Sequence, residues 1–152
     1  MAWRGVRRPP ASVDGAPHRR VDRDAFSAEL ARLIEQGRSL GAEVVLCTYP
    51  TAFSEARRVG AGAPDWMIET HVGEGSLDDL IRLQESYNDA VRDAAVAGGV
   101  ALVDLEAEFT AADKSRLYDN PGRGDLVHPD EAGYEVIARA LLPVVSAAAA
   151  RR

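Results

Sequence analysis

The sequence predicts an α/β fold in which helices alternate with parallel strands. Three segments with an apolar residue at every third or fourth position are separated by two short apolar runs. The resulting order is helix, strand, helix, strand, helix, which is typical of parallel strands joined by crossover helices. Two parallel strands need neighbouring strands and cover on both faces. The pattern therefore indicates the second half of a doubly wound domain.

The first helix is expected to begin near Asp22, because Asp22 or Asp24 can accept hydrogen bonds from free amides of the first turn. One face of this helix carries Phe26, Leu30, Leu33, Ile34 and Gly37. Gly41 follows, as is typical just after a helix end. Residues 43–49 are apolar on both faces, which predicts a buried parallel strand with Cys47 as a small core residue.

Residues 50–75 contain several glycines and are expected to form a long irregular connection. A second helix is predicted over about residues 77–97, ended by two glycines at 98 and 99. Its inward stripe is expected to be Leu77, Leu80, Ile81, Gln84, Tyr87, Val91 and Ala95. Ser76 is followed three residues later by Asp79, which is the pattern of a capping box.

The second strand is predicted at 100–103 and ends at Asp104, with a short helical piece over 106–112. A polar loop then leads to Pro129, where the last helix is expected to begin. Its apolar face is expected to carry Tyr134, Ile137, Ala138, Leu141 and Val145. Pro143 is expected to kink or end this helix, because proline removes a backbone hydrogen bond.

Composition limits the classes of partner. The 152 residues fit one domain, which we divide into a basic, loop-like arm (1–21) and a folded portion (22–152). The formal net charge of −6 argues against nucleic acid or an anionic membrane surface as the main partner. A single cysteine rules out an intrachain disulfide.

Targeting signals are not evident in the sequence. The basic N-terminal segment lacks the apolar stretch of a signal peptide. The apolar segment 138–150 is interrupted by Pro143 and is short for a bilayer, so no membrane span is expected. A soluble chain is therefore expected, cytoplasmic by default, although a targeting signal could lie in a missing N-terminus.

The most informative polar segment is 124–130, where Asp125 precedes His128 by three residues. Pro129 favours an extended backbone at His128, just before a helix and outside the carboxyl ends of the strands, where ligands bind in open α/β sheets. A turn can bring the Asp125 carboxylate to an imidazole N–H and fix its tautomer. The spacing alone also allows a purely structural role in capping and loop closure.

Residues 125–134, Asp-Leu-Val-His-Pro-Asp-Glu-Ala-Gly-Tyr, resemble the last sequence block of SGNH (GDSL-type) serine hydrolases, in which Asp-x-x-His-Pro leads into the final helix. Segments 87–92 and 99–105 are similar to the family's penultimate helix and last strand, and 24–50 to the preceding helix and strand. The resemblance covers most of the chain from Asp22. It implies a flavodoxin-like, three-layer α/β/α parallel sheet, an ester substrate, small or acylated, and no cofactor.

The resemblance also implies a mechanism. A serine attacks the ester carbonyl, His128 is general base and then general acid, and Asp125 orients the imidazole. The family carries its serine in Gly-Asp-Ser, and an oxyanion-hole asparagine in Gly-x-Asn-Asp. This sequence contains neither motif, and residues 1–6 resemble the stretch that follows the second one. We therefore expect a chain that starts late and lacks the first three strands, the nucleophile and the oxyanion donors. The open sheet edge would then favour self-association.

Other candidates are weaker. Ser12 and Ser54 have no positioning element, and Ser76 fits a capping role. Trp66 and His71 could line a substrate pocket, or be a local apolar anchor and a surface histidine. No second histidine or cysteine pair has metal-ligand spacing, so no metal site is expected. The alternative function is an inactive remnant, or a module that binds a small ligand or a protein through the 50–75 connection.

Overall fold

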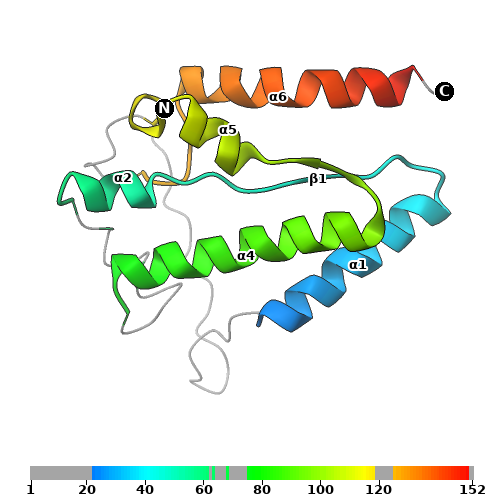
Figure 1. The fold of residues 1–152 in the computed structure, drawn as a ribbon, viewed down its shortest axis with the longest axis horizontal. Coiled ribbons are helices and arrows are strands. Elements are labelled where there is room, and N and C mark those ends of the chain that lie inside the picture. The colour runs from blue at the N-terminus through cyan, green and yellow to red at the C-terminus, as the bar shows by residue number, and fades with distance from the viewer. Residues whose placement is uncertain (1–21, 62, 64–67, 69–74, 119–124, 151–152) are drawn as a thin grey trace, which may run out of the picture.

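The computed structural model describes residues 22–61, 63, 68, 75–118 and 125–150. The described residues are mostly helical and contain a small parallel sheet, which confirms the α/β class with parallel strands (Figure 1). Strands β1 and β2 pair with Val45 opposite Ala101 and Cys47 opposite Val103. In chain order the elements are α1 (Arg23–Ser39), β1 (Val45–Cys47), α2 (Phe53–Arg58), α4 (Leu77–Gly98), β2 (Ala101–Val103), α5 (Leu105–Ala111), the 3₁₀ helix η1 (Lys114–Arg116) and α6 (Glu131–Ala149).

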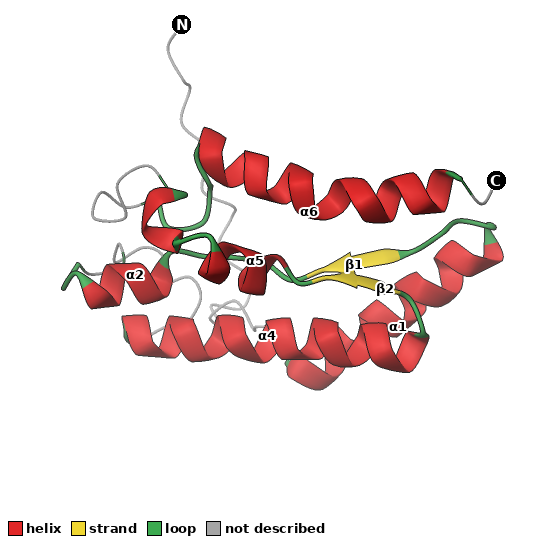
Figure 2. Cartoon of the chain, turned by 45° about the horizontal axis from the view of Figure 1, so that its top comes forward, coloured by secondary structure: helices red, strands yellow, loops and turns green. Residues whose placement is uncertain are grey.

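Helices cover both faces of the strand pair. Helix α4 contacts both strands and α1 packs on α4, while α6 contacts β2 and α5 (Figure 2). Figure 2 places α6 on the opposite side of the strands from α1 and α4. Within the described ranges the sheet consists of β1 and β2 alone, so each strand has one edge without a described neighbour. Self-association through such an edge stays a prediction.

The predicted starts of α1 and α4 and the predicted end of α4 are confirmed, and each is fixed by local interactions. The Asp22 carboxylate accepts from the Ala25 amide at 2.7 Å and caps α1. At the start of α4, the Ser76 hydroxyl accepts from the Asp79 amide at 3.3 Å, and the Asp79 carboxylate accepts from the Ser76 amide at 2.7 Å. Gly99 ends α4 with φ of 58°, a left-handed conformation that glycine adopts without a steric penalty.

The predicted buried faces of two helices need correction. On α1 the predicted burial of Leu30 and Ile34 is confirmed, but Leu33 is exposed. In α6, Tyr134 and Val145 are exposed, whereas the buried residues are Gly133 and Val136. Helical periodicity predicts a stripe about 100° wide or more, but the neighbouring elements decide which part of that stripe is covered.

Strand β1 is shorter than the predicted segment and less buried. Val45 and Leu46 are half-buried, and Cys47 is exposed rather than a core residue. The prediction assumed strand neighbours on both sides and cover on both faces. A two-stranded sheet does not supply that cover along its whole length, so the thiol stays accessible.

The connection after β1 and the start of the last helix also differ from expectation. Residues 53–58 form helix α2 within the segment predicted to be irregular. Helix α6 begins at Glu131, because the Asp130 carboxylate accepts from the Gly133 amide at 2.9 Å and so caps it. Pro143 does not end α6, which continues to Ala149.

Helix α6 bears on the question of a membrane span. It is the one helix in the described part of the chain that is long and apolar enough to cross a bilayer by length and composition. Contrary to expectation, Pro143 does not interrupt this apolar stretch. One such helix is weak evidence, so the structure does not indicate a membrane span.

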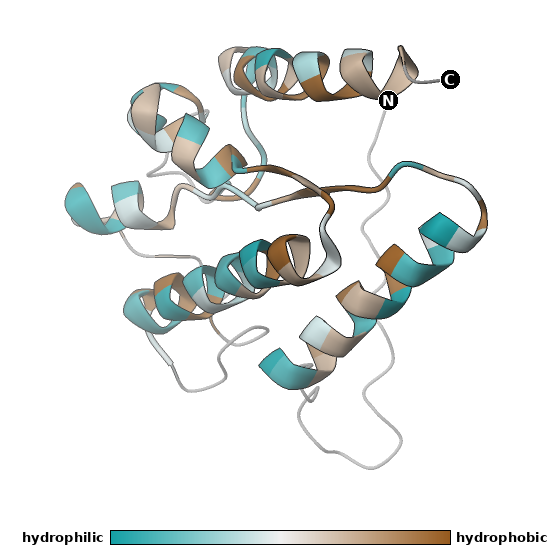
Figure 3. Cartoon of the chain, turned by 45° about the vertical axis from the view of Figure 1, so that its right-hand side comes forward, coloured by the Kyte–Doolittle hydropathy of each residue, from teal (hydrophilic) through white to brown (hydrophobic). Residues whose placement is uncertain are grey.

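The apolar core lies beyond the carboxyl ends of the strands, between α2, α4, α5 and α6. Figure 3 shows the strands themselves as strongly apolar segments that lead into this region. Leu126, from the loop before α6, is fully buried in the core and so fixes that loop to the body of the protein. Other buried members are Ala52, Phe53, Ala56, Ala63, Leu80, Ile81, Phe109, Leu117, Tyr118 and Val136.

Candidate functional site

Residues 125–130, here called the His128 loop, are held at the carboxyl end of strand β1. The Leu126 carbonyl accepts from the Ala52 amide at 2.8 Å. The Tyr49 hydroxyl donates to the Val127 carbonyl at 3.0 Å. Tyr49 and Ala52 both follow β1 closely in sequence, so these bonds place the loop where parallel sheets bind their ligands.

The other end of the loop is also fixed. The Asp130 amide donates to the Leu117 carbonyl at 3.0 Å, and Asp130 itself caps α6. His128 thus lies between two anchored points, although its own side chain is 71% exposed. This arrangement presents an imidazole to solvent from a loop whose backbone is held in place.

Asp125 and His128 are in direct contact, as their spacing predicts. Asp125 Oδ1 lies 3.1 Å from His128 Nδ1, and Oδ2 lies 3.2 Å from the same nitrogen. Oδ1 also accepts from the His128 amide at 2.9 Å and from the Val127 amide at 3.3 Å. With its proton on Nδ1, the neutral imidazole donates to the carboxylate and leaves the Nε2 lone pair free to accept a proton.

The Asp125 carboxylate is suited to stabilise a charged imidazole. Partial burial acts to raise its pKa, but the His128 and Val127 amides and the His128 ring outweigh this and hold the pKa below its usual value. The carboxyl group is therefore ionised at neutral pH. Its side chain is 52% exposed, so solvent screens the attraction between the pair.

None of the described hydroxyl groups hydrogen-bonds to His128. Ser54 is exposed on α2, and the Ser76 hydroxyl accepts from the Asp79 amide at 3.3 Å, which confirms its capping role. Ser12, Trp66 and His71 lie outside the described residues. Over the same described ranges, no three His, Cys, Asp or Glu side chains gather in a way that could hold a metal ion.

An ion pair that sequence reasoning missed joins the carboxyl ends of both strands to α4. Asp104, which follows β2, accepts from Arg92 at 2.8 and 3.1 Å and from the Thr48 hydroxyl at 2.8 Å. Thr48 follows β1, and its hydroxyl accepts from the Glu106 amide at 3.0 Å. The Arg92 guanidinium, followed by the Thr48 hydroxyl and the Ala107 amide, lowers the pKa of Asp104 to about 2 against the opposing effect of burial.

Two side-chain amides of α4 fix the backbone of Tyr49. Asn88 accepts from the Tyr49 amide at 2.8 Å and donates to the Tyr49 carbonyl at 3.0 Å. Gln84 donates to the same carbonyl at 2.7 Å. The available sequence signal was Gln84 as the polar member of an otherwise apolar stripe. These bonds matter for the site because Tyr49 in turn holds the His128 loop.

A buried polar cluster lies close to Tyr49. Lys114 is buried and forms an ion pair with Glu106, whose second oxygen accepts from Gln84 at 3.2 Å. The nearby Tyr118 hydroxyl is buried and has no hydrogen-bond partner among the described residues. Burial first, and then the charge of Glu106, raise the pKa of Tyr118 well above its usual value.

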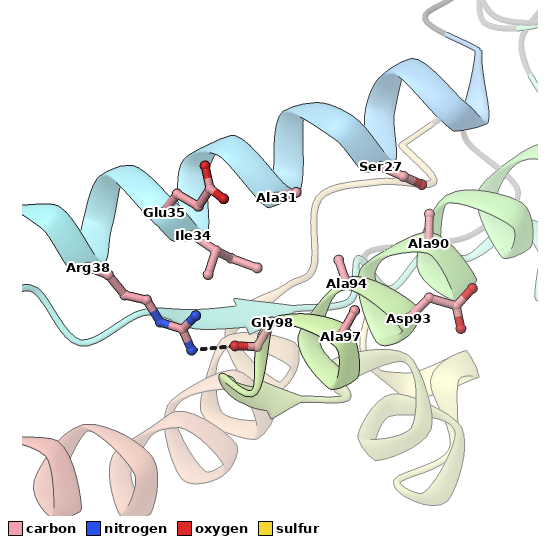
Figure 4. A pocket seen from close by; sticks show the side chains of 10 residues that line it. All are labelled: Ser27, Ala31, Ile34, Glu35, Arg38, Ala90, Asp93, Ala94, Ala97 and Gly98. Carbon is pink, nitrogen blue, oxygen red and sulfur yellow. Dashed lines mark hydrogen bonds between the residues drawn. The ribbon is translucent and has the colours of Figure 1, made fainter.

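Several cavities of about 360 to 520 Å³ open on the described residues, and two of them lie along helix α4. One, of about 410 Å³, lies between α2, α4 and the His128 loop, with Val127 and Tyr49 in its wall. The other, of about 360 Å³, lies between α1 and α4 (Figure 4). Its wall contains four alanines together with the charged residues Glu35, Arg38 and Asp93, and Arg38 donates to the Gly98 carbonyl. No residue of the His128 loop lines this second cavity.

Comparison with known proteins adds no assignment: no family model, no curated protein and no solved structure matches this chain. The candidate function therefore depends on the geometry of the His128 loop and on the sequence resemblance.

Proposed function

We propose that this chain provides the His–Asp half of the catalytic machinery of an SGNH-type serine esterase. The observation that carries the proposal is the contact of the Asp125 carboxylate with His128 Nδ1, at 3.1 and 3.2 Å, beneath an exposed imidazole. Its place at the carboxyl end of β1 supports the same proposal. The flavodoxin-like sheet of that family belongs to this proposal too, supported by helices on both faces of a parallel strand pair.

In this mechanism His128 Nε2 takes the proton of a serine hydroxyl while the serine oxygen attacks the ester carbonyl. The proton then passes from Nε2 to the departing alcohol oxygen. Asp125 keeps the reactive lone pair on Nε2 and stabilises the imidazolium that forms. The serine and the oxyanion donors come from outside the described residues, and the reaction uses no cofactor.

The test combines the upstream reading frame with fluorophosphonate labelling, which marks activated serines. We expect the frame upstream of Met1 to remain open and to encode Gly-Asp-Ser and Gly-x-Asn-Asp. The longer protein should be labelled at that serine, and His128→Ala should abolish labelling. Arg139→Ala, at an exposed position of α6, is the matched control and should leave labelling unchanged.

Two results would overturn the proposal. One is a labelled serine within the 152 residues themselves, since the nucleophile would then lie in this chain. The other is an upstream frame that is closed or lacks both motifs. The second result would favour the alternative function.

The alternative is a non-catalytic module that binds a small ligand. It is favoured by the lack of a described hydroxyl in contact with His128, together with the apolar cavity beside the loop. A longer protein that binds an apolar ligand but is never labelled would support this alternative.

A further inference from the structure

We infer that the cavity beside the His128 loop binds the apolar group of the ester, so that the substrates are small esters with a short to medium-length alkyl chain. This inference rests on the proposed esterase function. The cavity measures about 410 Å³, which is near the lower end of the range for small-molecule sites. That volume fits a short alkyl chain better than a bulky or polymeric substrate.

The wall of the cavity is mostly apolar. Phe53 of α2 and Leu80 of α4 are buried and form its floor, and Leu83 lies beside them on α4. The rings of Tyr49 and Tyr87 and the side chain of Val127 complete the apolar lining. Burial of an alkyl chain here removes apolar surface from water, which favours binding by about 0.8 kcal/mol per methylene.

The two amide side chains in the wall already have hydrogen-bond partners. Gln84 Nε2 donates to the Tyr49 carbonyl at 2.7 Å and to Glu106 at 3.2 Å, so both of its N–H groups have acceptors. Asn88 is buried and bonds to both backbone groups of Tyr49. These amides hold the wall in shape and do not select a polar ligand, which is why we assign the cavity to an apolar group.

The cavity adjoins the proposed general base through two residues. Val127 lines the cavity and immediately precedes His128 in the chain. Tyr49 also lines it, and the Tyr49 hydroxyl holds the Val127 carbonyl at 3.0 Å. An alkyl chain in the cavity would therefore lie against the loop that carries the imidazole.

The binding test uses the 152-residue chain alone and needs no catalysis. Methyl hexanoate is titrated into ¹⁵N-labelled protein, and amide shifts are expected for Thr51, Leu83 and Val127, with a dissociation constant on the order of millimolar. Leu83→Trp, which fills the cavity, should weaken binding by about tenfold or more. Leu33→Trp, at an exposed position on α1, is the matched control and should leave binding within about twofold.

A second variant separates a loss of ester binding from a loss of folding. Leu83→Asp introduces a charge into the apolar wall without adding bulk, and should also weaken methyl hexanoate binding. Thermal melting followed by circular dichroism identifies which variants remain folded. Shifts that map elsewhere, or binding that is unchanged in folded Leu83 variants, would overturn the inference.

The failure of this inference and of the proposed function can be told apart. Cavity binding without serine labelling of the longer protein leaves the cavity assignment standing and removes the esterase. Serine labelling of the longer protein without ester binding in the cavity supports the esterase and removes the cavity assignment. In an active longer protein, methyl hexanoate or hexyl acetate should be hydrolysed with a kcat/KM about tenfold above that for methyl acetate. Faster hydrolysis of methyl hexanoate would show that the cavity takes the acyl chain, and faster hydrolysis of hexyl acetate that it takes the alcohol chain. Leu83→Trp should remove the preference for the longer esters over methyl acetate.

Discussion

One carboxylate oxygen of Asp125 contacts both the backbone and the ring of His128. Oδ1 lies 2.9 Å from the His128 amide nitrogen and 3.1 Å from Nδ1. The conformation of the loop and the orientation of the imidazole therefore depend on the same atom. A change at Asp125 should alter both together.

The first prediction concerns the imidazole tautomer. In Asp125→Ala the neutral ring loses the acceptor at Nδ1, so the proton should move towards Nε2, the form usually preferred without such a partner. Ring ¹⁵N shifts, recorded at a pH above which they no longer change, report the ratio of the two neutral tautomers. Asp24→Ala, at another exposed aspartate, is the control. An unchanged ratio in Asp125→Ala would show that the carboxylate does not orient the ring.

The second prediction concerns the ion pair between Asp104 and Arg92. Asp104→Asn should lower the free energy of unfolding by about 1–2 kcal/mol, because the half-buried guanidinium loses its charged partner. Asp89→Asn is a matched control, since Asp89 also bonds to Arg92 but is 61% exposed. It should cost less than about 0.5 kcal/mol in urea unfolding.

The pH dependence of this pair has a definite sign. The pKa of Asp104 in the folded protein is about 2, below the ordinary value of 3.8. Its contribution to stability is therefore fully present above about pH 4 and is lost as the pH falls towards about 2. The difference in unfolding free energy between the natural chain and Asp104→Asn should shrink across that window. A constant difference would contradict the lowered pKa.

The third prediction concerns the capping box of α4. Ser76→Ala should lower the free energy of unfolding by about 1 kcal/mol, because the Asp79 amide loses its acceptor. The Ser76 hydroxyl is also the main reason why the pKa of Asp79 falls to about 2, so that pKa should rise in the variant. NMR titration of the Asp79 carboxyl measures this change. Ser54→Ala, within α2, has no capping bond and should alter neither quantity.

The fourth prediction concerns close packing at Gly133. A Cβ atom there would lie 2.5 Å from Pro129 Cβ and 2.6 Å from the Leu117 carbonyl oxygen. Gly133→Ala should therefore destabilise the protein by about 1–3 kcal/mol in urea unfolding. It should also shift the His128 amide resonance, because Pro129 belongs to the same loop. Gly98→Ala is the contrast: its Cβ would meet the flexible end of the Ile34 side chain, so a smaller cost is expected.

The fifth prediction concerns the buried hydroxyl of Tyr118. Tyr118→Phe removes a polar group that has no partner among the described residues, while it keeps the ring that packs against Phe109. We expect an unfolding free energy that is unchanged or higher. A loss of more than about 1 kcal/mol would indicate that the hydroxyl makes a hydrogen bond in the folded protein.

Apart from the pairing of the two parallel strands, the features that the sequence predicted correctly are made by residues close together in the chain. Asp22 caps α1 and Ser76 caps α4 through amides three residues away. The Asp125–His128 contact has the same spacing, so the order of residues in that segment is enough to predict it. Such interactions need only a turn of backbone, and local residue types determine whether that turn forms.

The features decided only by the tertiary structure join distant parts of the chain. Asn88 binds the backbone of Tyr49 and Arg92 binds Asp104 only after β1, α4 and β2 have packed together. The exposure of Cys47 likewise depends on how many strands and helices lie around β1, which the apolar run itself does not specify. Local spacing therefore determined the His–Asp pair. The hydrogen bonds from Asn88 and Gln84 to the Tyr49 backbone, and the apolar cavity beside the His128 loop, form only when distant segments of the chain pack together.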